Sequence, residues 1–235
     1  MLLRLKNIQK SFDKKEVLTD ISFQIEKGKI YALLGRNGAG KTTLFNILAE
    51  ELKEDLGEVT LEEGTSSRAL TSDDLAYVYS SPILPDFLTG YEFIKFFMDI
   101  NKDRLTHTQT IDDYFNLIRF EEEDRHKLIM NYSHGMKNKI EMLLFLIAKP
   151  PVILLDEPLT SLDVVVALEM KKLLRNIREN HIIIFSTHIL QLALDICDEV
   201  VVLNEGKLSL LDHDMLSDAN FEDEIIELLK EKTDA

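Results

Sequence analysis

The sequence is short of cysteine and of long apolar runs, and each shortage excludes a class of protein. Its single cysteine, Cys197, can form neither an internal disulfide nor a cysteine-rich metal site, so we expect a reduced, cytosolic protein. The longest unbroken apolar run covers residues 142–148, whereas a membrane-spanning helix needs about 20 apolar residues. Arg4 and Lys6 interrupt the N-terminus where a secretion signal would be continuously apolar. We therefore expect neither a membrane span nor a signal peptide.

Positive charge is also scarce, because the formal net charge is −15 at pH 7. Broad nucleic-acid binding needs a basic surface that releases counterions, so this composition argues against it. Part of the negative charge is concentrated in residues 211–235, which hold nine acidic residues and two lysines. We interpret this segment as an acidic C-terminal tail with a solvated helix around residues 225–229.

What the chain does contain is a series of short β-like runs. With 235 residues, 45% of them hydrophobic and 29% charged, it is an ordinary globular sequence with room for one α/β domain and a satellite. The runs at 152–155 and 182–185 are continuously apolar, as strands of a parallel sheet buried on both faces should be. The earliest runs alternate and are separated by turn residues, which predicts an antiparallel sheet with one solvated face.

Between about residue 82 and residue 150 the pattern becomes helical, and the β-like runs resume after Pro151. We therefore predict a single domain over residues 1–210, in which an α/β core is interrupted by an inserted helical subdomain. The acidic tail follows this domain.

The strongest motif is GRNGAGKTT at residues 35–43, which follows an apolar strand and precedes a helix-like run at 44–52. Gly35, Gly38 and Gly40 let the backbone bend tightly and approach a ligand without a Cβ in the way. The amides of residues 37–41 can then converge on phosphate oxygens at a helix N-terminus, where the helix dipole favours anions. This context predicts a phosphate-binding loop of a nucleotide site rather than a simple glycine-rich turn.

A second motif, PVILLDEP at 151–158, completes the expected chemistry. We expect Lys41 to reach the β- and γ-phosphates and the Thr42 hydroxyl to bind Mg²⁺. The strand ends in Asp156 and Glu157, because Pro158 forbids its continuation. Asp156 should then lie near the same Mg²⁺, and Glu157 can orient a water toward the γ-phosphate.

Two histidines follow at informative places. His188 ends a further buried strand, where a histidine is more often a cap, but its position on the same sheet as the acidic pair favours a role at the site. His134 lies in YSHGM, where Ser133 is placed to cap a helix whose apolar face runs from Met136 to Ile147. That stretch is either an ordinary capped helix or an anion site formed with the amides from Gly135 onward.

These stretches, in this order, resemble the ATP-binding subunits of ABC transporters, and the resemblance covers nearly everything before the tail. It implies a P-loop NTPase (RecA-like) core with an N-terminal antiparallel β subdomain and the helical insertion. It also implies that YSHGM is the signature loop that binds the ATP of a facing subunit, that Asp163 in TSLD crosses the dimer interface, and that Phe12 stacks on adenine. The implied catalytic residues are Glu157, His188 and Lys41. The implied ATP-binding residues are Phe12, Gly35, Asn37, Gly38, Ala39, Gly40, Lys41, Thr42, Thr43, Ser133, Gly135 and Asp163, with Thr42 and Asp156 as Mg²⁺ ligands.

The sequence departs from this family's pattern in three places. His134 replaces the first signature glycine and adds bulk where backbone should approach phosphate. Ser80 replaces a glutamine that contacts Mg²⁺, and its shorter hydroxyl would act only through a water. The crossing loop at 160–166 reads TSLDVVV. Two interpretations of His134 follow: either its side chain turns outward and the neighbouring residues still bind phosphate, or the signature is weakened and a different subunit supplies an intact one.

The resemblance implies two such subunits that sandwich two ATP molecules with Mg²⁺ and drive a membrane permease. The chain would lie in the cytoplasm, attached to the inner face of the membrane through the permease. Its motifs look most like those of exporters of drugs, peptides or antibiotics. The dimer partner is either a second copy or a different ATP-binding subunit. The alternatives are a low-turnover ATP-binding regulatory subunit and a soluble relative acting on DNA or ribosomes, whose second cassette, long arms or basic patches this chain lacks.

Overall fold

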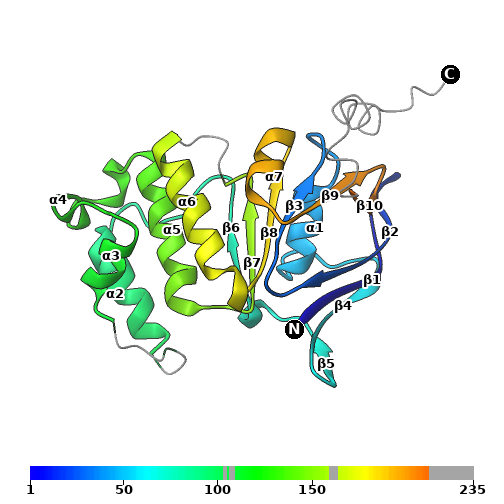
Figure 1. Ribbon diagram of the computed structural model, residues 1–235, viewed down its shortest axis with the longest axis horizontal. Coiled ribbons are helices and arrows are strands. Elements are labelled where there is room, and N and C mark those ends of the chain that lie inside the picture. The colour runs from blue at the N-terminus through cyan, green and yellow to red at the C-terminus, as the bar shows by residue number, and fades with distance from the viewer. Residues whose placement is uncertain (103–104, 106–108, 159–163, 212–235) are drawn as a thin grey trace.

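The computed structural model describes residues 1–102, 105, 109–158 and 164–211. One sheet lies at one end of the molecule, a second sheet in the middle and most helices at the other end (Figure 1). The predicted crossing-loop aspartate and almost all of the predicted acidic tail lie outside the described residues.

The first sheet is antiparallel, as predicted for the early part of the chain. Its strands alternate between buried and exposed residues, which is the pattern of a sheet with one solvated face. In spatial order they are β2 (Lys15–Glu26), β1 (Leu2–Phe12), β4 (Leu56–Glu63) and β5 (Ser66–Ala69).

The second sheet forms the centre of the molecule and is parallel except for β10 (Lys207–Leu210), which runs antiparallel to its neighbour. Its inner strands β3, β7 and β8 are completely buried, because helices or the first sheet cover both of their faces. In spatial order the strands are β10 (Lys207–Leu210), β9 (Glu199–Asn204), β3 (Ile30–Leu34), β8 (Ile182–Thr187), β7 (Val152–Asp156) and β6 (Leu75–Val78).

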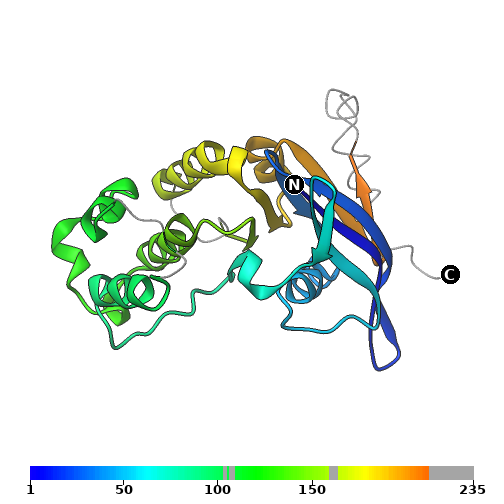
Figure 2. The ribbon, with the colours of Figure 1, turned by 90° about the horizontal axis from the view of Figure 1, so that it is seen from below.

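Two apolar cores flank this parallel sheet. Helix α1 (Lys41–Leu48) contributes Leu44 and Phe45 to the core between the two sheets. The opposite face belongs to a second core that also contains residues of α6 (Val164–Ile177) and α7 (Leu190–Ile196). Seen from below, α1 and the long helices lie on opposite faces of the sheet (Figure 2). The adjacent residues Ala32 and Leu33 therefore point into different cores.

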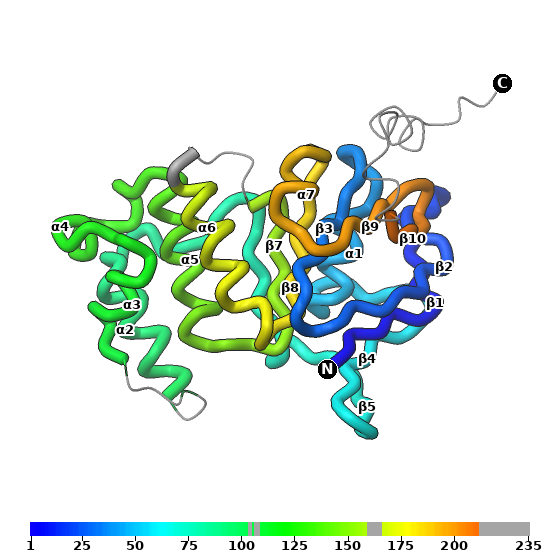
Figure 3. The backbone as a smooth tube through the Cα atoms, in the orientation of Figure 1, coloured from blue at the N-terminus to red at the C-terminus, as the bar shows by residue number. Residues whose placement is uncertain are grey.

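The helical segment is inserted between β6 and β7. The tube trace shows the chain leaving the sheet after β6 and returning to it at β7 (Figure 3). The helices in this excursion are α2 (Gly90–Ile100), α3 (Ile111–Leu117), α4 (Glu122–Arg125) and α5 (His134–Ala148). Thr89 and Thr110 cap α2 and α3 by accepting hydrogen bonds from the backbone of Glu92 and Asp113.

The structure differs from the sequence-based expectation in several elements. Strand β5 and helices α6 and α7 were not predicted. Helix α1 ends at Leu48 instead of continuing to residue 52, because Glu50 has a left-handed φ of 58° and the amides of Glu51 and Leu52 both donate to the Asn46 carbonyl.

Candidate active site

The phosphate loop joins the buried end of β3 to the first turn of α1. Its path requires glycine at two positions. A Cβ on Gly35 would lie 2.8 Å from the Leu203 carbonyl oxygen. Gly40 has a φ of 105°, and its Cβ would lie 2.9 Å from Val17 Cγ1. The loop therefore fits between β9 and β2 only because these side chains are absent.

Lys41 is buried with its ammonium group turned back over this loop. Its Nζ donates to the carbonyl oxygens of Gly35 at 2.8 Å and Arg36 at 3.2 Å. It also lies 3.6 Å from Glu157 Oε1. Burial lowers the pKa of Lys41, and the negative charges of Glu157 and Asp156 partly offset this effect. A buried ammonium with two carbonyls and one carboxylate is well placed to receive a further anion.

Asp156 stands at the carboxyl end of β7 and contacts two hydroxyl groups. Thr42 Oγ1 donates to its Oδ2 at 3.0 Å, and Ser186 Oγ donates to its Oδ1 at 2.5 Å. These hard oxygen donors suit Mg²⁺, which keeps waters and substrate oxygens and needs only one or two protein ligands. In the described part of the chain no group of three or more His, Cys, Asp or Glu residues could hold a metal by itself. The Thr42 hydroxyl and the Asp156 carboxylate fit Mg²⁺ as its protein ligands.

Ser186 is a site residue that the sequence analysis did not assign. It is fully buried, and its hydroxyl also accepts a hydrogen bond from the backbone N–H of Glu157 at 3.0 Å. The signal in the sequence was a serine at the end of an otherwise apolar strand. Its meaning depends on register, because parallel pairing places Ser186 directly beside Asp156.

Glu157 connects the phosphate loop to His188. Its Oε1 lies 3.0 Å from His188 Nδ1 on one side and close to Lys41 on the other. The Glu157 backbone has a φ of 47°, an uncommon conformation for a non-glycine residue outside a turn. The structure thus brings Lys41, Thr42, Asp156, Glu157 and His188 together at the carboxyl edge of the parallel sheet.

A cavity of about 410 Å³ lies beside the phosphate loop, between β2 and the turn from β9 to β10. Phe12 does not line this cavity, but it pairs across the β1–β2 hairpin with Lys15, which does. Phe12 is 45% exposed, and Lys10 Nζ lies 5.6 Å from the centre of its ring. Of the predicted ATP-binding residues, Asn37, Gly38 and Ala39 line this cavity. Thr43 does not line it and is half-buried in α1.

The residues of the YSHGM stretch lie apart from this edge. Ser133 caps α5 and accepts a hydrogen bond from the Met136 N–H at 3.2 Å. Ser133 and His134 are exposed, and Gly135 is half-buried. Ser80 is also exposed, and within the described residues no hydrogen bond ties it to Thr42 or Asp156. One chain alone therefore does not join the signature residues to the phosphate loop.

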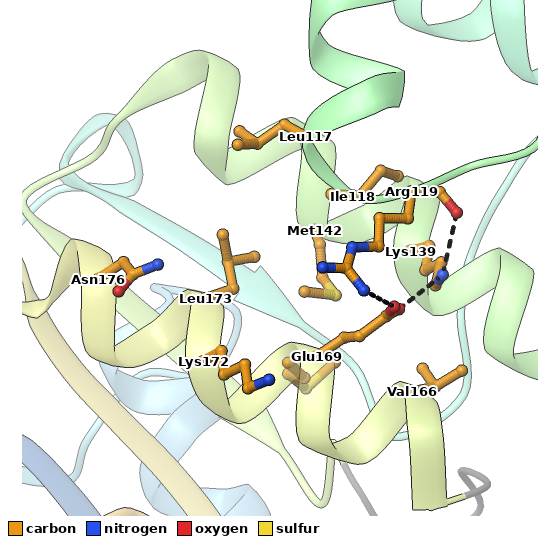
Figure 4. Close-up of a pocket in the computed structure, with 11 residues that line it drawn as sticks. Leu117, Ile118, Arg119, Lys139, Met142, Val166, Glu169, Lys172, Leu173 and Asn176 are labelled. Atoms are coloured by element: carbon orange, nitrogen blue, oxygen red, sulfur yellow. Dashed lines mark hydrogen bonds and ion pairs between the residues drawn. The ribbon is translucent and has the colours of Figure 1, made fainter.

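A second cavity, of about 210 Å³, separates the inserted helices from α6 (Figure 4). Glu169 on α6 forms ion pairs with Lys139 on α5 at 2.9 Å and with Arg119, after α3, at 3.6 Å. Lys139 also donates to the Arg119 carbonyl oxygen at 3.3 Å. These contacts bridge the helical insertion and the core.

Among the described residues, no helix combines the length and apolar character that crossing a bilayer requires.

The model of the ABC transporter family matches residues 18–160, which include the phosphate loop and the acidic pair. The chain belongs to the ABC transporter family. It is 30% identical over 210 residues to the uncharacterized ABC transporter ATP-binding protein YxlF of Bacillus subtilis (strain 168), covering 88% of this chain and 70% of the relative. The match identifies the chain as an ATP-binding subunit of this family.

Solved structures agree with this assignment. An ATP-binding subunit of an ABC transporter superposes with a TM-score of 0.81 at 25% identity, covering 98% of this chain and all of the other. The ATP-binding cassette MJ0796, in a dimeric post-hydrolysis state bound to ADP and Pi, shares the fold with a TM-score of 0.74 at 19% identity. That match covers 89% of this chain and 99% of the other. The predicted fold class, a P-loop NTPase core with an antiparallel sheet and a helical insertion, is confirmed.

Proposed function

We propose that this ABC subunit hydrolyses Mg-ATP and powers a membrane exporter through ATP-driven dimerisation. The observation that carries this proposal is the contact of Glu157 Oε1 with both Lys41 Nζ and His188 Nδ1, beside the Thr42–Asp156 hydrogen bond. These contacts place a cation, a carboxylate and a proton-exchanging ring where a terminal phosphate would meet the helix N-terminus. They also favour turnover over a purely regulatory ATP-binding role.

Each residue at this edge takes a role that its contacts support. Lys41 exchanges its carbonyl partners for the β- and γ-phosphate oxygens, while the loop amides from Asn37 onward bind the same groups. Glu157 accepts a proton from the attacking water, and His188 keeps the Glu157 carboxylate in position. Thr42 and Asp156 would hold Mg²⁺, which when bound neutralises charge on the phosphates.

The second half of each site comes from a facing subunit in this proposal. Ser133 and the amides from Gly135 onward form a helix N-terminus that suits an anion, and α5 is 15 residues long. Because Ser133 is exposed, Gly135 is only half-buried and both lie apart from Lys41, they are available to the ATP of another copy or of a different ATP-binding subunit. Asp163 would cross the same interface, and Phe12 would stack on adenine.

The remaining assignments follow from family membership and composition. Residues 1–210 would form the ATPase domain, with the helical subdomain at about 82–150 and the acidic tail after it. The subunit would lie on the cytoplasmic face of the membrane through its permease. The exporter type rests on the similarity of the stretches at 37–48, 88–97 and 135–146 to those of exporters of drugs, peptides or antibiotics. The net charge of −15 argues against nucleic acid as a partner.

The decisive experiment measures the mass of the Glu157→Gln variant by light scattering with Mg-ATP. Removing the hydrolytic carboxylate should trap the ATP sandwich, so we expect a shift from monomer to dimer that ADP or EDTA abolishes. A variant that binds ATP and stays monomeric would contradict homodimerisation and require a different partner subunit. Equal turnover in the variant and the wild type would contradict the catalytic assignment itself.

His134 provides a separate test of the signature. Because its side chain is exposed, we expect His134→Gly to leave the ATPase rate of the chain unchanged. A higher rate would show that the histidine weakens closure on phosphate, as in a degenerate subunit that depends on an intact partner.

A further inference from the structure

A cavity of about 220 Å³ opens between β6, the loop that follows it and helix α5. Figure 1 shows β6 and α5 side by side, and the two elements are in contact. Aromatic and aliphatic side chains form most of its wall, and one carboxylate, that of Glu141, interrupts them. The wall residues that matter below are Tyr77, Tyr79, Ile83, Glu141 and Leu144.

Glu141 is buried without a full set of partners. It is 6% exposed, and its Oε1 accepts a hydrogen bond from the Ile83 N–H at 3.1 Å. Its Oε2 is buried, and no described residue gives it a hydrogen bond. Burial raises the pKa of Glu141 to about 7, although the Ile83 N–H acts in the opposite direction. A buried carboxyl with an unsatisfied oxygen is costly, so its presence on this wall points to a missing partner.

The surroundings of Glu141 are acidic and aromatic. Lys137, one turn earlier on α5, is already engaged in an ion pair with Asp86 at 2.9 Å. Tyr79 donates a hydrogen bond to Glu51. Burial, followed by Glu51 and Glu141, raises the pKa of Tyr79 to about 12. No lysine or arginine lines the cavity within the described residues. Carboxylates and tyrosine rings without a compensating base are the chemistry that accepts a cation.

Apolar side chains on the adjoining loop indicate that this cation belongs to a protein. Ile83 is 72% exposed and Phe87, on the same loop, is 77% exposed. Met130, whose N–H donates to the Asp86 carbonyl oxygen at 3.2 Å, is 61% exposed. Large exposed apolar side chains near a charged socket are typical of a protein-binding surface.

We propose that this cavity is a socket for one lysine or arginine side chain of the transmembrane partner, with Glu141 as its counter-ion. The identity of the partner rests on the proposed function, whereas the preference for a cation rests on the cavity itself. Glu141 holds the loop that carries Ile83 against α5, and α5 begins at the signature residues. A partner seated in the socket would therefore contact the loop and the signature helix at the same time.

The first test uses n-butylammonium as a lysine side-chain probe and n-butanol as its neutral match. We expect n-butylammonium at pH 8 to give saturable NMR shifts of the Ile83 and Leu144 methyl groups in the wild-type chain. Glu141→Gln keeps the acceptor for the Ile83 N–H and removes the charge, so binding should weaken more than about tenfold. Equal shifts in both proteins, or equal shifts from n-butanol, would overturn the socket.

The second test measures saturable binding of the full chain to inverted membrane vesicles from the source organism. We expect Glu141→Gln to bind these vesicles more weakly than wild type, and Glu141→Lys more weakly still. Protein-free vesicles of the same lipids should bind none of the three proteins. Equal binding by all variants would overturn the socket while leaving the proposed function intact. A wild-type chain that binds no native vesicle would overturn both the partner and the proposed function.

Discussion

The nucleotide edge, which is the carboxyl end of the parallel sheet around Lys41 and Asp156, differs from the helical insertion in how some of its polar groups are bonded. At the edge, Lys41, Asp156 and Ser186 are buried, and each is bonded to a neighbour. In the insertion, one of the two ion pairs to Glu169 uses Arg119, whose side chain is 78% exposed, and the buried Glu141 keeps one oxygen to which no described residue donates a hydrogen bond.

This difference follows from how each region is built. Parallel pairing fixes the register of β7 and β8, so the Ser186 hydroxyl meets Asp156, and Thr42 in the first turn of α1 reaches the same carboxylate with a short side chain. The insertion shares an apolar core with the sheet, but its ion pairs with α6 use long, partly solvated side chains, which hold their geometry weakly. The edge therefore holds its polar groups in a defined geometry, which suits chemistry.

The largest effect is expected when the carboxylate of Glu157 is removed from the nucleotide edge. Glu157→Gln should lower ATP hydrolysis by about 10²–10⁴-fold, because glutamine cannot accept a proton from the water although it can still contact His188. Phosphate release measures this effect, with Glu58→Gln, at an exposed position on β4, as the matched control. A loss smaller than about tenfold would assign the proton to another group.

The second prediction concerns Glu141, the buried carboxyl of the insertion that has one oxygen without a hydrogen-bond donor among the described residues. Its pKa is about 7 in the folded chain against an ordinary value of 4.5, so the folded state holds the proton more tightly than the unfolded state. The free energy of unfolding should therefore fall as pH rises from about 4.5 through 7, by roughly 3 kcal/mol at most.

Denaturant titrations across this pH range measure the effect in the wild type and in Glu141→Gln. The variant should lack this part of the pH dependence. The slope is the informative quantity, because the new amide also lacks a partner for its N–H groups. Identical slopes would contradict a buried, proton-holding Glu141.

Ser186→Ala tests whether mutual bonding stabilises the edge. The change leaves Asp156 Oδ1 and the Glu157 N–H without their partner, so we expect the free energy of unfolding to fall by about 1–3 kcal/mol. Ser22→Ala is the contrast, because Ser22 accepts a single exposed hydrogen bond from the Asn7 N–H. Equal losses of unfolding free energy in the two variants would mean that the buried hydrogen bonds of Ser186 stabilise the protein no more than an exposed one does.

The smallest effect is expected where the insertion meets the core. Arg119→Ala removes an exposed ion pair with Glu169 and should change the free energy of unfolding by about 0–1 kcal/mol. Arg125→Ala should cost more, because Arg125 is buried and donates to both Asn116 Oδ1 and the Phe120 carbonyl oxygen. Thermal unfolding of the two variants compares them directly, and a reversed order would contradict the distinction between exposed and buried pairs.

The helices that the sequence analysis missed show where local pattern fails. Helix α6 begins with three valines, and β-branched residues have low helix propensity and favour strands. Helix α7 has seven residues, which is too short for a clear helical period. Both become helices because they cover the second face of the parallel sheet. This packing depends on the assembled fold and not on the local sequence.

The sequence by itself determined the features that depend on neighbours along the chain. These are the glycines of the phosphate loop, the acidic pair at the end of an apolar strand, and the serine that caps α5. Their order was enough to indicate the family and the fold class. Glycine conformation, strand termination and helix capping are local effects, so they can be recognised from short stretches.

Only the tertiary structure decided which distant groups meet. The register of β7 and β8 placed Ser186 beside Asp156, and the sheet edge brought His188 and Lys41 to the same oxygen of Glu157. The packing of α5 against β6 buried Glu141 without a cation. Hydrogen bonding and desolvation act through space, and a sequence does not state the distances on which they depend.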